Sequence, residues 1–206
     1  MRFGILLFEG CEELDVFGPY EALQAAARLG ADFEVRCGIA QATTRVTMAM
    51  GTRLESPDTL ELHAGDWLIV PGGGWLSSSG PGARAELQKG ELPRLIAEWR
   101  RQGIWVASVC TGAMLLAAAG LTKDRVATTH RGAREDLRKT GALVVEARVV
   151  DDGDLVTAGG VSSGIDLAIW LTERFAGKPL ARQLRDYLEY PCEPDIHFGP
   201  KAGQPL

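Results

Sequence analysis

The sequence predicts a single α/β domain built on a doubly wound, mostly parallel sheet with helices on both faces. Short apolar runs alternate with longer amphipathic segments along most of the 206 residues, which is the order of elements in such sheets. The first run, Arg2–Phe8, is almost continuously apolar, as in a strand covered on both faces. Glycine-rich turns follow several of the runs, where a parallel sheet places its functional loops.

The first half of the chain supplies four strands and three helices of this fold. Pro19 fits the first turn of the first helix, and Gly30 ends that helix. In chain order we expect strand 2–8, helix 15–29, strand 33–38, a hairpin-like excursion over 43–50 that turns at Gly51, strand 67–70, helix 92–102, strand 104–109 and helix 111–119.

The second half continues the alternation. In chain order we expect a short strand at 127–129, helix 132–140, strands 143–145 and 149–151 with a turn at Asp152-Gly153, strand 155–158, and helices 164–175 and 179–188. Residues 1–190 therefore form the α/β domain. Residues 191–206 contain four prolines among polar residues, which predicts a tail without a packed core of its own.

Composition excludes several classes of function. The formal net charge is -5, and no Lys/Arg cluster is present to neutralise phosphates, so nucleic-acid binding is not expected. No apolar stretch is long enough to span a bilayer. The apolar start is followed at once by acidic residues, without a small-residue cleavage site, so we interpret it as a strand and not a signal peptide. A cytoplasmic protein without membrane contact is expected.

Four cysteines are present, at positions 11, 37, 110 and 192. None forms a CxxC pair, and their spacing matches no zinc site, so we expect free thiols, no metal and no cofactor. Cys110 differs from the others because it falls between a predicted strand and a predicted helix, flanked by Ser108 and Gly112. A helix N-terminus there favours the thiolate, the species that attacks electrophiles. A buried, inert cysteine is the equally plausible alternative.

Two glycine turns are expected to face Cys110 from neighbouring strands. Gly72-Gly73-Gly74 follows one strand, and its backbone N–H groups are suited to hold developing negative charge. It is no P-loop, because no Gly-Lys-Ser/Thr follows. Gly159-Gly160 follows another strand. If these turns share one edge of the sheet with Cys110, they converge on one pocket.

Two titratable side chains are candidates to accompany the thiol. Asp15 stands between Leu14 and Val16, which suits either a partly buried acid or the N-cap of the following helix. His130 is either a base for Cys110 or a structural, hydrogen-bonded histidine.

The pentapeptide Gly160–Gly164 matches the serine nucleophile pattern G-x-S-x-G. Such enzymes need an acid and then a histidine downstream, and the only downstream histidine is His197, in the predicted tail. We therefore expect this segment to line the pocket without acting as a nucleophile.

Taken together, five segments resemble the DJ-1/PfpI superfamily over nearly the whole chain. They are Phe8-Glu9-Gly10 leading to Glu13-Leu14-Asp15, Val70-Pro71-Gly72-Gly73, Ser108-Val109-Cys110-Thr111-Gly112 followed by 115–121, Ala127-Thr128-Thr129-His130, and Gly159-Gly160 followed by Ser163-Gly164-Ile165-Asp166. Within the superfamily, S-V-C-T-G and L-D-x-x-G-P are similar to isocyanide hydratase and to the amidotransferase-like domain of AraC-type regulators. Thr111 replaces the histidine of the peptidase-like members, and Asp15 replaces the glutamate of DJ-1 itself.

This resemblance implies a cysteine-dependent hydro-lyase. Cys110 would be the nucleophile toward a small electrophilic molecule such as an isocyanide, and Asp15 the proton carrier. The resemblance also implies substrate contacts at Gly73, Gly74, Thr111 and Gly160, a homodimer, and no cofactor. Glu9 stands where hydratase-like relatives often carry proline, so the pocket rim differs.

Two other interpretations share this fold. One is a ligand-sensing protein, although the chain after Tyr190 is too short for the helix-turn-helix of the regulators. The other is a stress protein in which Cys110 senses oxidants through a sulfinic form.

Overall fold

The computed structural model describes residues 1–55, 57–77, 79–191 and 194–203. Its centre is a sheet in the order β11-β9-β10-β6-β5-β1-β2, parallel except for the pairing of β9 with β10. The strands are β1 (Arg2–Leu7), β2 (Glu34–Ile39), β5 (Trp67–Val70), β6 (Trp105–Ser108), β9 (Val149–Asp151), β10 (Leu155–Ala158) and β11 (Ile196–Phe198). The expected doubly wound, mostly parallel sheet is confirmed.

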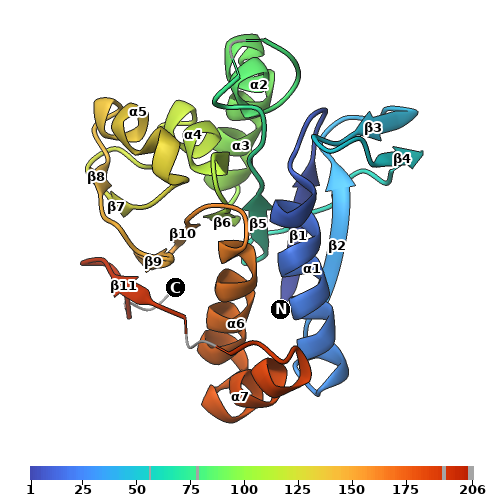
Figure 1. Ribbon diagram of the computed structural model, residues 1–206, viewed down its shortest axis with the longest axis vertical. Coiled ribbons are helices and arrows are strands. Elements are labelled where there is room, and N and C mark those ends of the chain that lie inside the picture. The colour runs from blue at the N-terminus through green and yellow to red at the C-terminus, as the bar shows by residue number, and fades with distance from the viewer. Residues whose placement is uncertain (56, 78, 192–193, 204–206) are drawn as a thin grey trace.

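Helices cover both faces of this sheet (Figure 1). One layer contains α1 (Glu13–Arg28), α6 (Ser163–Ala176) and α7 (Lys178–Tyr187). The other contains α2 (Ala83–Lys89), α3 (Glu91–Arg101), α4 (Gly112–Ala118) and α5 (Arg134–Lys139), which follows the 3₁₀ turn η1 (Arg131–Ala133). Outside the sheet lie two small ribbons, β3 (Arg45–Thr47) with β4 (Arg53–Glu55), and β7 (Val126–Ala127) with β8 (Leu143–Val144).

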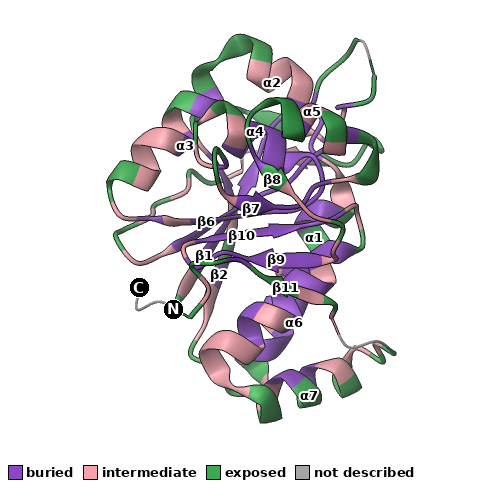
Figure 2. Ribbon diagram, turned by 90° about the vertical axis from the view of Figure 1, so that its left-hand side faces the viewer, coloured by how far each residue is buried: buried purple, intermediate pink, exposed green. Residues whose placement is uncertain are grey.

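The core lies between the sheet and the two helix layers. Figure 2 shows the central strands buried along their length, with exposed residues on the outer surfaces of the helices. Every residue of β5 and β10 is buried, as expected for strands covered on both faces. Among the described helices, none has the length and apolar character needed to cross a bilayer.

The predicted C-terminal tail contributes a strand to the sheet. β11 pairs in parallel with β9, and the ring of Phe198 contacts Trp170 on α6 with centroids 5.3 Å apart. Beyond it, the Lys201 N–H donates to the carboxylate of Asp152 at 3.1 Å. The sequence did not indicate this strand, because three residues give no usable periodicity. Cys192, expected to be a free thiol, lies outside the described residues, whereas Cys11, Cys37 and Cys110 are free.

Close backbone packing joins β5 to the start of α4. A Cβ atom on Gly112 would lie 2.0 Å from the carbonyl oxygen of Val70, a contact that neither backbone can relieve by a rotamer change. We expect Gly112→Ala to lower the free energy of unfolding by about 3 kcal/mol, measured by urea denaturation. In the control, Gly18→Ala in α1, the new Cβ comes no nearer than 3.4 Å to Ile165, so the change should stay within about 1 kcal/mol. Equal effects of the two changes would contradict this interpretation.

Candidate active site

Three adjacent strands deliver the candidate residues to one edge of the sheet. Asp15 lies in the first turn of α1 after β1, Gly72 follows β5, and Cys110 follows β6. In the sheet β5 lies between β1 and β6, so the carboxyl ends of these strands are neighbours. The Cys110 N–H donates to the carbonyl of Gly159 at 2.7 Å, so the turn after β10 also contacts the candidate site. The turns after β5 and β10 therefore lie beside the Cys110-Thr111 turn at one edge of the sheet, while their convergence on one pocket stays a prediction.

Cys110 occupies a strained turn between β6 and α4. Its φ is +56°, a left-handed value that non-glycine residues adopt rarely and mainly where the surrounding structure enforces it. The Thr129 hydroxyl donates to the Cys110 carbonyl at 2.8 Å and so helps to hold the turn. The side chain is buried, with 6% of its surface exposed. Such a turn projects the side chain out of the line of the strand, which is the arrangement used by nucleophile elbows.

Asp15 is a buried acid and not a helix cap. The helix begins at Glu13, and Glu12 takes the N-cap position. The Gly72 N–H donates to Oδ2 of Asp15 at 2.9 Å, whereas Oδ1 has no partner at ordinary hydrogen-bond geometry among the described residues. The pKa of Asp15 is raised to about 7, mainly because the carboxyl is buried; the Gly72 N–H offsets part of this rise, the charge of Glu12 adds to it, and the Cys110 thiol offsets a further part.

The thiol and the carboxylate face each other and determine each other's protonation. Burial, followed by the charge of Asp15, raises the pKa of the Cys110 thiol to about 12, although backbone N–H groups of Val161 and Thr111 lower it in part. The expectation of a thiolate favoured by a helix N-terminus is therefore wrong for the resting protein. α4 has only seven residues, and desolvation with a facing carboxylate outweighs its dipole. At neutral pH the sulfur therefore keeps its proton, whereas the Asp15 carboxyl gains and loses its proton near that pH.

The other residues predicted to bind substrate have different surroundings in the structure. Thr111 is at the site, but its hydroxyl accepts the Gly73 N–H at 3.0 Å, so that N–H is already engaged. Gly74 packs against the backbone of Pro81 and Gly82. Gly160 packs against the ring of His130, where a Cβ would meet Cδ2 at 2.6 Å.

His130 has a structural hydrogen bond. Its Nδ1 accepts the Gly132 N–H at 3.1 Å and thereby caps η1. Burial, with the charges of Arg131 and Arg134, lowers its pKa. The main influences on the pKa of the Cys110 thiol come from burial, from Asp15 and from the backbone N–H groups of Val161 and Thr111, and not from His130.

Two functional groups were missed by the sequence reasoning. Val161 adopts a φ of +35°, and its N–H points at the Cys110 sulfur. No sequence signal marks a valine for this conformation, which usually favours glycine. The N–H of Gly72 orients the Asp15 carboxylate, and in the sequence only the position of Gly72 in a glycine run pointed to it.

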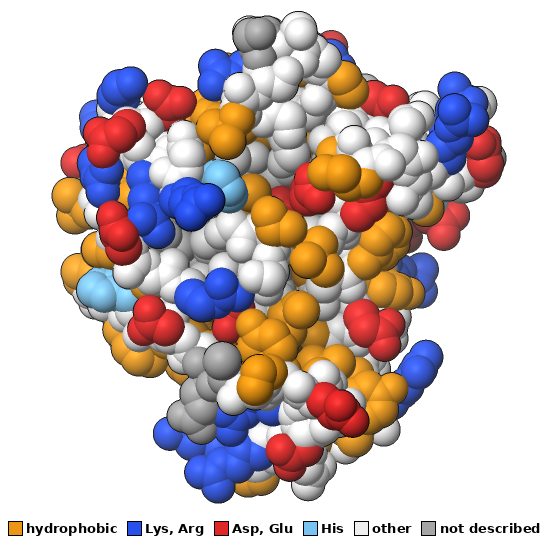
Figure 3. Space-filling model, viewed as in Figure 1, with side chains coloured by type: hydrophobic (Ala, Val, Ile, Leu, Met, Phe, Trp, Pro, Cys, Tyr) orange, Lys and Arg blue, Asp and Glu red, His pale blue; other side chains and the backbone are white. Residues whose placement is uncertain are grey.

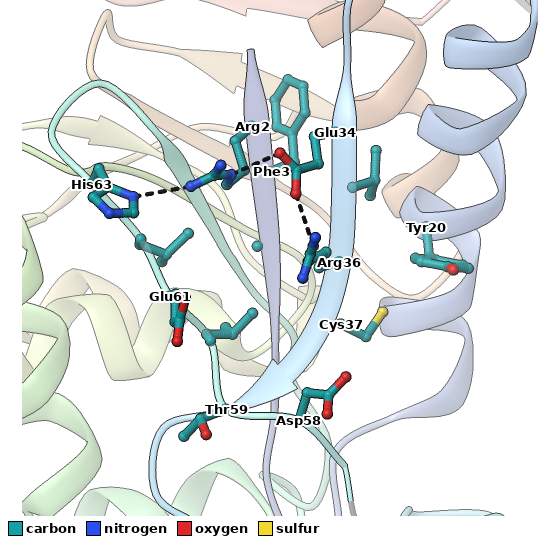
Figure 4. Close-up of a pocket in the computed structure, with 14 residues that line it drawn as sticks. Arg2, Phe3, Tyr20, Glu34, Arg36, Cys37, Asp58, Thr59, Glu61 and His63 are labelled. Carbon is teal, nitrogen blue, oxygen red and sulfur yellow. Dashed lines mark hydrogen bonds and ion pairs between the residues drawn. The ribbon is translucent and has the colours of Figure 1, made fainter.

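A cavity of about 670 Å³ lies apart from these residues (Figure 4). Its labelled polar side chains include Arg2, Glu34, Arg36 and His63, which bond to one another where β1 and β2 begin. Neither Asp15 nor Cys110 lines it. Among the described residues no three His, Cys, Asp or Glu side chains gather as a metal site.

The pattern of the DJ-1/PfpI family matches residues 1–174. The chain belongs to the DJ-1/PfpI family. A DJ-1/PfpI relative, the isonitrile hydratase of Pseudomonas putida, is 33% identical over 200 residues, which cover 97% of this chain and 82% of that protein. Protein DJ-1alpha of Drosophila melanogaster is 24% identical over 196 residues, covering 92% and 84%.

Solved structures share the DJ-1/PfpI fold. A ThiJ/PfpI family protein from Pseudomonas syringae superposes with a TM-score of 0.80 at 25% identity, covering 94% of this chain and 76% of that one. An AraC family transcriptional regulator from Pseudomonas putida has a TM-score of 0.75 at 23% identity, covering 91% and 98%. The proteins that this chain resembles in sequence or in fold thus include ones named as hydratase and as regulator, so membership of the family does not by itself determine the reaction.

Proposed function

We propose that this protein hydrates an isocyanide to an N-substituted formamide, with Cys110 as nucleophile and Asp15 as proton carrier. The observation that carries the proposal is the facing pair of a strained thiol and a buried carboxylate, one oxygen of which has no conventional hydrogen-bond partner among the described residues. An acid whose pKa is close to neutral can both accept and return a proton. The similarity to an isonitrile hydratase supports the substrate class.

In the first stage the S–H group of Cys110 adds to the terminal carbon of the isocyanide, so that this one carbon gains both the sulfur and the proton. Asp15 takes the thiol proton as sulfur bonds to that carbon, and then delivers the proton to the same carbon. The product is a thioimidate, in which sulfur and nitrogen flank a CH group. Because the thiol pKa is about 12, attack must be coupled to proton transfer and does not start from a free thiolate.

In the second stage water releases the product. Asp15 accepts a proton from water as the hydroxyl adds to the thioimidate carbon, and it passes that proton to the nitrogen. When this tetrahedral species collapses, the carbon–sulfur bond breaks and the hydroxyl proton moves through Asp15 to the sulfur, which restores the thiol and leaves the formamide. The sum is one isocyanide and one water for one formamide, with no external oxidant or cofactor.

The direct test is to incubate the purified protein with a simple aryl or alkyl isocyanide and to follow formamide formation. Turnover that disappears in Cys110→Ala but persists in Cys37→Ala supports the proposal. If no isocyanide is turned over while mild peroxide converts Cys110 selectively to a sulfinic acid, the redox-sensing alternative replaces it.

The pH dependence of turnover follows from the Asp15–Cys110 pair. Below pH 7 the buried Asp15 carboxyl is mostly protonated and cannot accept the thiol proton, so kcat/KM should rise about tenfold per pH unit up to pH 7 and level off above it. The measurement is kcat/KM from pH 5 to 9, with acid hydrolysis of the isocyanide subtracted by a blank containing Cys110→Ala. A flat profile, or one that falls with pH, would exclude this role of Asp15.

A further inference from the structure

Arg148, directly before β9, contacts the turn between β10 and α6 on both sides of Val161. Its carbonyl accepts the Gly159 N–H at 2.9 Å, and its Nη2 donates to Oγ of Ser162 at 3.1 Å. Val161 lies between these two contacts with its left-handed φ, and its N–H points at the sulfur of Cys110. A single residue therefore holds the turn before and after the group that contacts the reactive sulfur.

An ion pair fixes the guanidinium group of Arg148. Its Nε donates to Oδ2 of Asp166 at 2.8 Å, and its Nη2 contacts the same oxygen. Asp166 lies in the first turn of α6 and is 1% exposed, and the Tyr190 hydroxyl donates to the same Oδ2 at 3.1 Å. Because a buried carboxylate needs a cation beside it, the guanidinium stays where it also reaches Ser162.

Ser162 occupies the N-cap position of α6 but does not cap the helix. A serine there usually accepts a backbone N–H of the first turn, whereas this side chain makes no such bond in the described part of the chain and accepts from Arg148 instead. A buried ion pair, for its part, adds little net stability, because apolar replacement of such pairs is often neutral. The contacts of Arg148 are therefore better explained by the position that they impose on the turn.

Arg148 is also poorly suited to bind an anion, because Asp166 already matches its charge. On the face of the molecule that carries α1 and α6, acidic side chains lie among the basic ones and do not form a separate field (Figure 3). A charge on this face acts mainly on its neighbour, which for Arg148 is the start of α6.

The position of the Val161 N–H matters because negative charge develops on sulfur during the reaction. The thiol keeps its proton at neutral pH, so the charge appears only as the proton leaves during attack, and again as the carbon–sulfur bond breaks. A backbone N–H that already points at the sulfur stabilises this charge without rearrangement of the site.

We propose that Arg148 is a positioning residue for the reactive cysteine. Its side chain holds Ser162 and the first turn of α6, which keeps the Val161 N–H directed at the Cys110 sulfur and accelerates each step in which the sulfur gains negative charge. The effect on turnover rests on the proposed isocyanide hydration, whereas the effect on alkylation of Cys110 does not.

The test removes the ion pair as a unit, with Arg148→Gln combined with Asp166→Asn, so that no buried charge is left without a partner. Iodoacetamide alkylation of Cys110 at pH 8, divided by that of Cys37 in the same sample, should fall about tenfold. For isocyanide hydration kcat should fall by a similar factor while KM stays within about twofold, because the N–H acts on the developing charge and not on substrate binding.

The matched control is the ion pair of the last turn of the same helix, where Arg174 pairs with Asp151 at 3.0 Å. Arg174→Gln combined with Asp151→Asn removes the same kind of buried pair far from the turn. It should leave the alkylation ratio and kcat unchanged. An equal fall in this control would mean general damage to α6 and would overturn the proposal.

Ser162→Ala provides a second test if the Arg148 variant does not fold, because it removes only the bond to the turn and leaves the ion pair intact. The alkylation ratio should fall about threefold, and an unchanged ratio in this variant would overturn the proposal. If no isocyanide is hydrated but the ratio falls as expected, the proposed function fails and the role of Arg148 is supported. If isocyanide is hydrated and neither ratio nor kcat changes, only the role of Arg148 fails.

Discussion

Cys110→Ala is expected to lower isocyanide turnover by at least about 10³-fold, because no other group at the site can form the thioimidate. Cys37→Ala should retain activity. Cys37 lies on β2, and burial raises the pKa of its thiol to about 12, as for Cys110. The two thiols therefore differ in backbone strain and in the facing carboxylate, not in acidity. The measurement is formamide formation under single-turnover conditions, with the thioimidate sought as a mass increase equal to the isocyanide.

Turnover by Cys110→Ala within about tenfold of the wild-type protein would contradict the nucleophile assignment. Equal alkylation rates of Cys110 and Cys37 in the wild-type protein would weaken it as well, because a strained and proton-coupled thiol should react faster with a small electrophile.

Asp15→Asn is expected to change turnover and thiol acidity in opposite directions. Turnover should fall by about 10²-fold or more, because an amide cannot carry the proton. The negative charge of Asp15 is one cause of the raised pKa of Cys110, so its removal should lower that pKa and accelerate alkylation at pH 8. If the substitution merely damaged the site, both turnover and alkylation of Cys110 would become slower. Measuring the rate of reaction with iodoacetamide beside turnover therefore distinguishes loss of the proton carrier from damage to the site.

The same change should stabilise the fold at alkaline pH. The pKa of Asp15 is about 7 in the folded protein and near its ordinary value of 3.8 in the unfolded chain. Between these values the folded protein holds a proton that the unfolded chain has lost, so stability falls as pH rises from 4 to 7 and stays lower above 7. A neutral amide at this position avoids the loss, so we expect Asp15→Asn to gain up to about 4 kcal/mol at pH 8. The gain should shrink toward pH 4, as measured by urea denaturation at both pH values.

The sequence was sufficient for most of the architecture because most elements carry a local signal. The buried strands are continuous apolar runs, and glycines mark the turns, so β5, β10 and α4 were expected within two residues of their observed bounds. α1 begins two residues earlier than expected, because Glu13 and Leu14 have no distinctive boundary signal. α2 was missed because its seven residues are mostly polar.

The sequence predicted that Cys110 and Asp15 lie at the same edge of the sheet, but it did not predict the pKa values of the thiol and the carboxyl group. Cys110 and Asp15 were recognised from their places after strands. Their protonation depends on how far the fold removes both from water and on the direction of each toward the other, which no one-dimensional pattern contains.

The pairing of β11 with β9 has a practical consequence for recombinant work. Production of a chain shortened after residue 190 would remove the strand that covers β9 and leave unpaired backbone groups beside an exposed Trp170. Such surfaces recruit other chains and promote aggregation. If the shortened protein were insoluble, the cause would be the loss of the strand that covers β9. That result would say nothing about whether the proline-rich residues take part in catalysis.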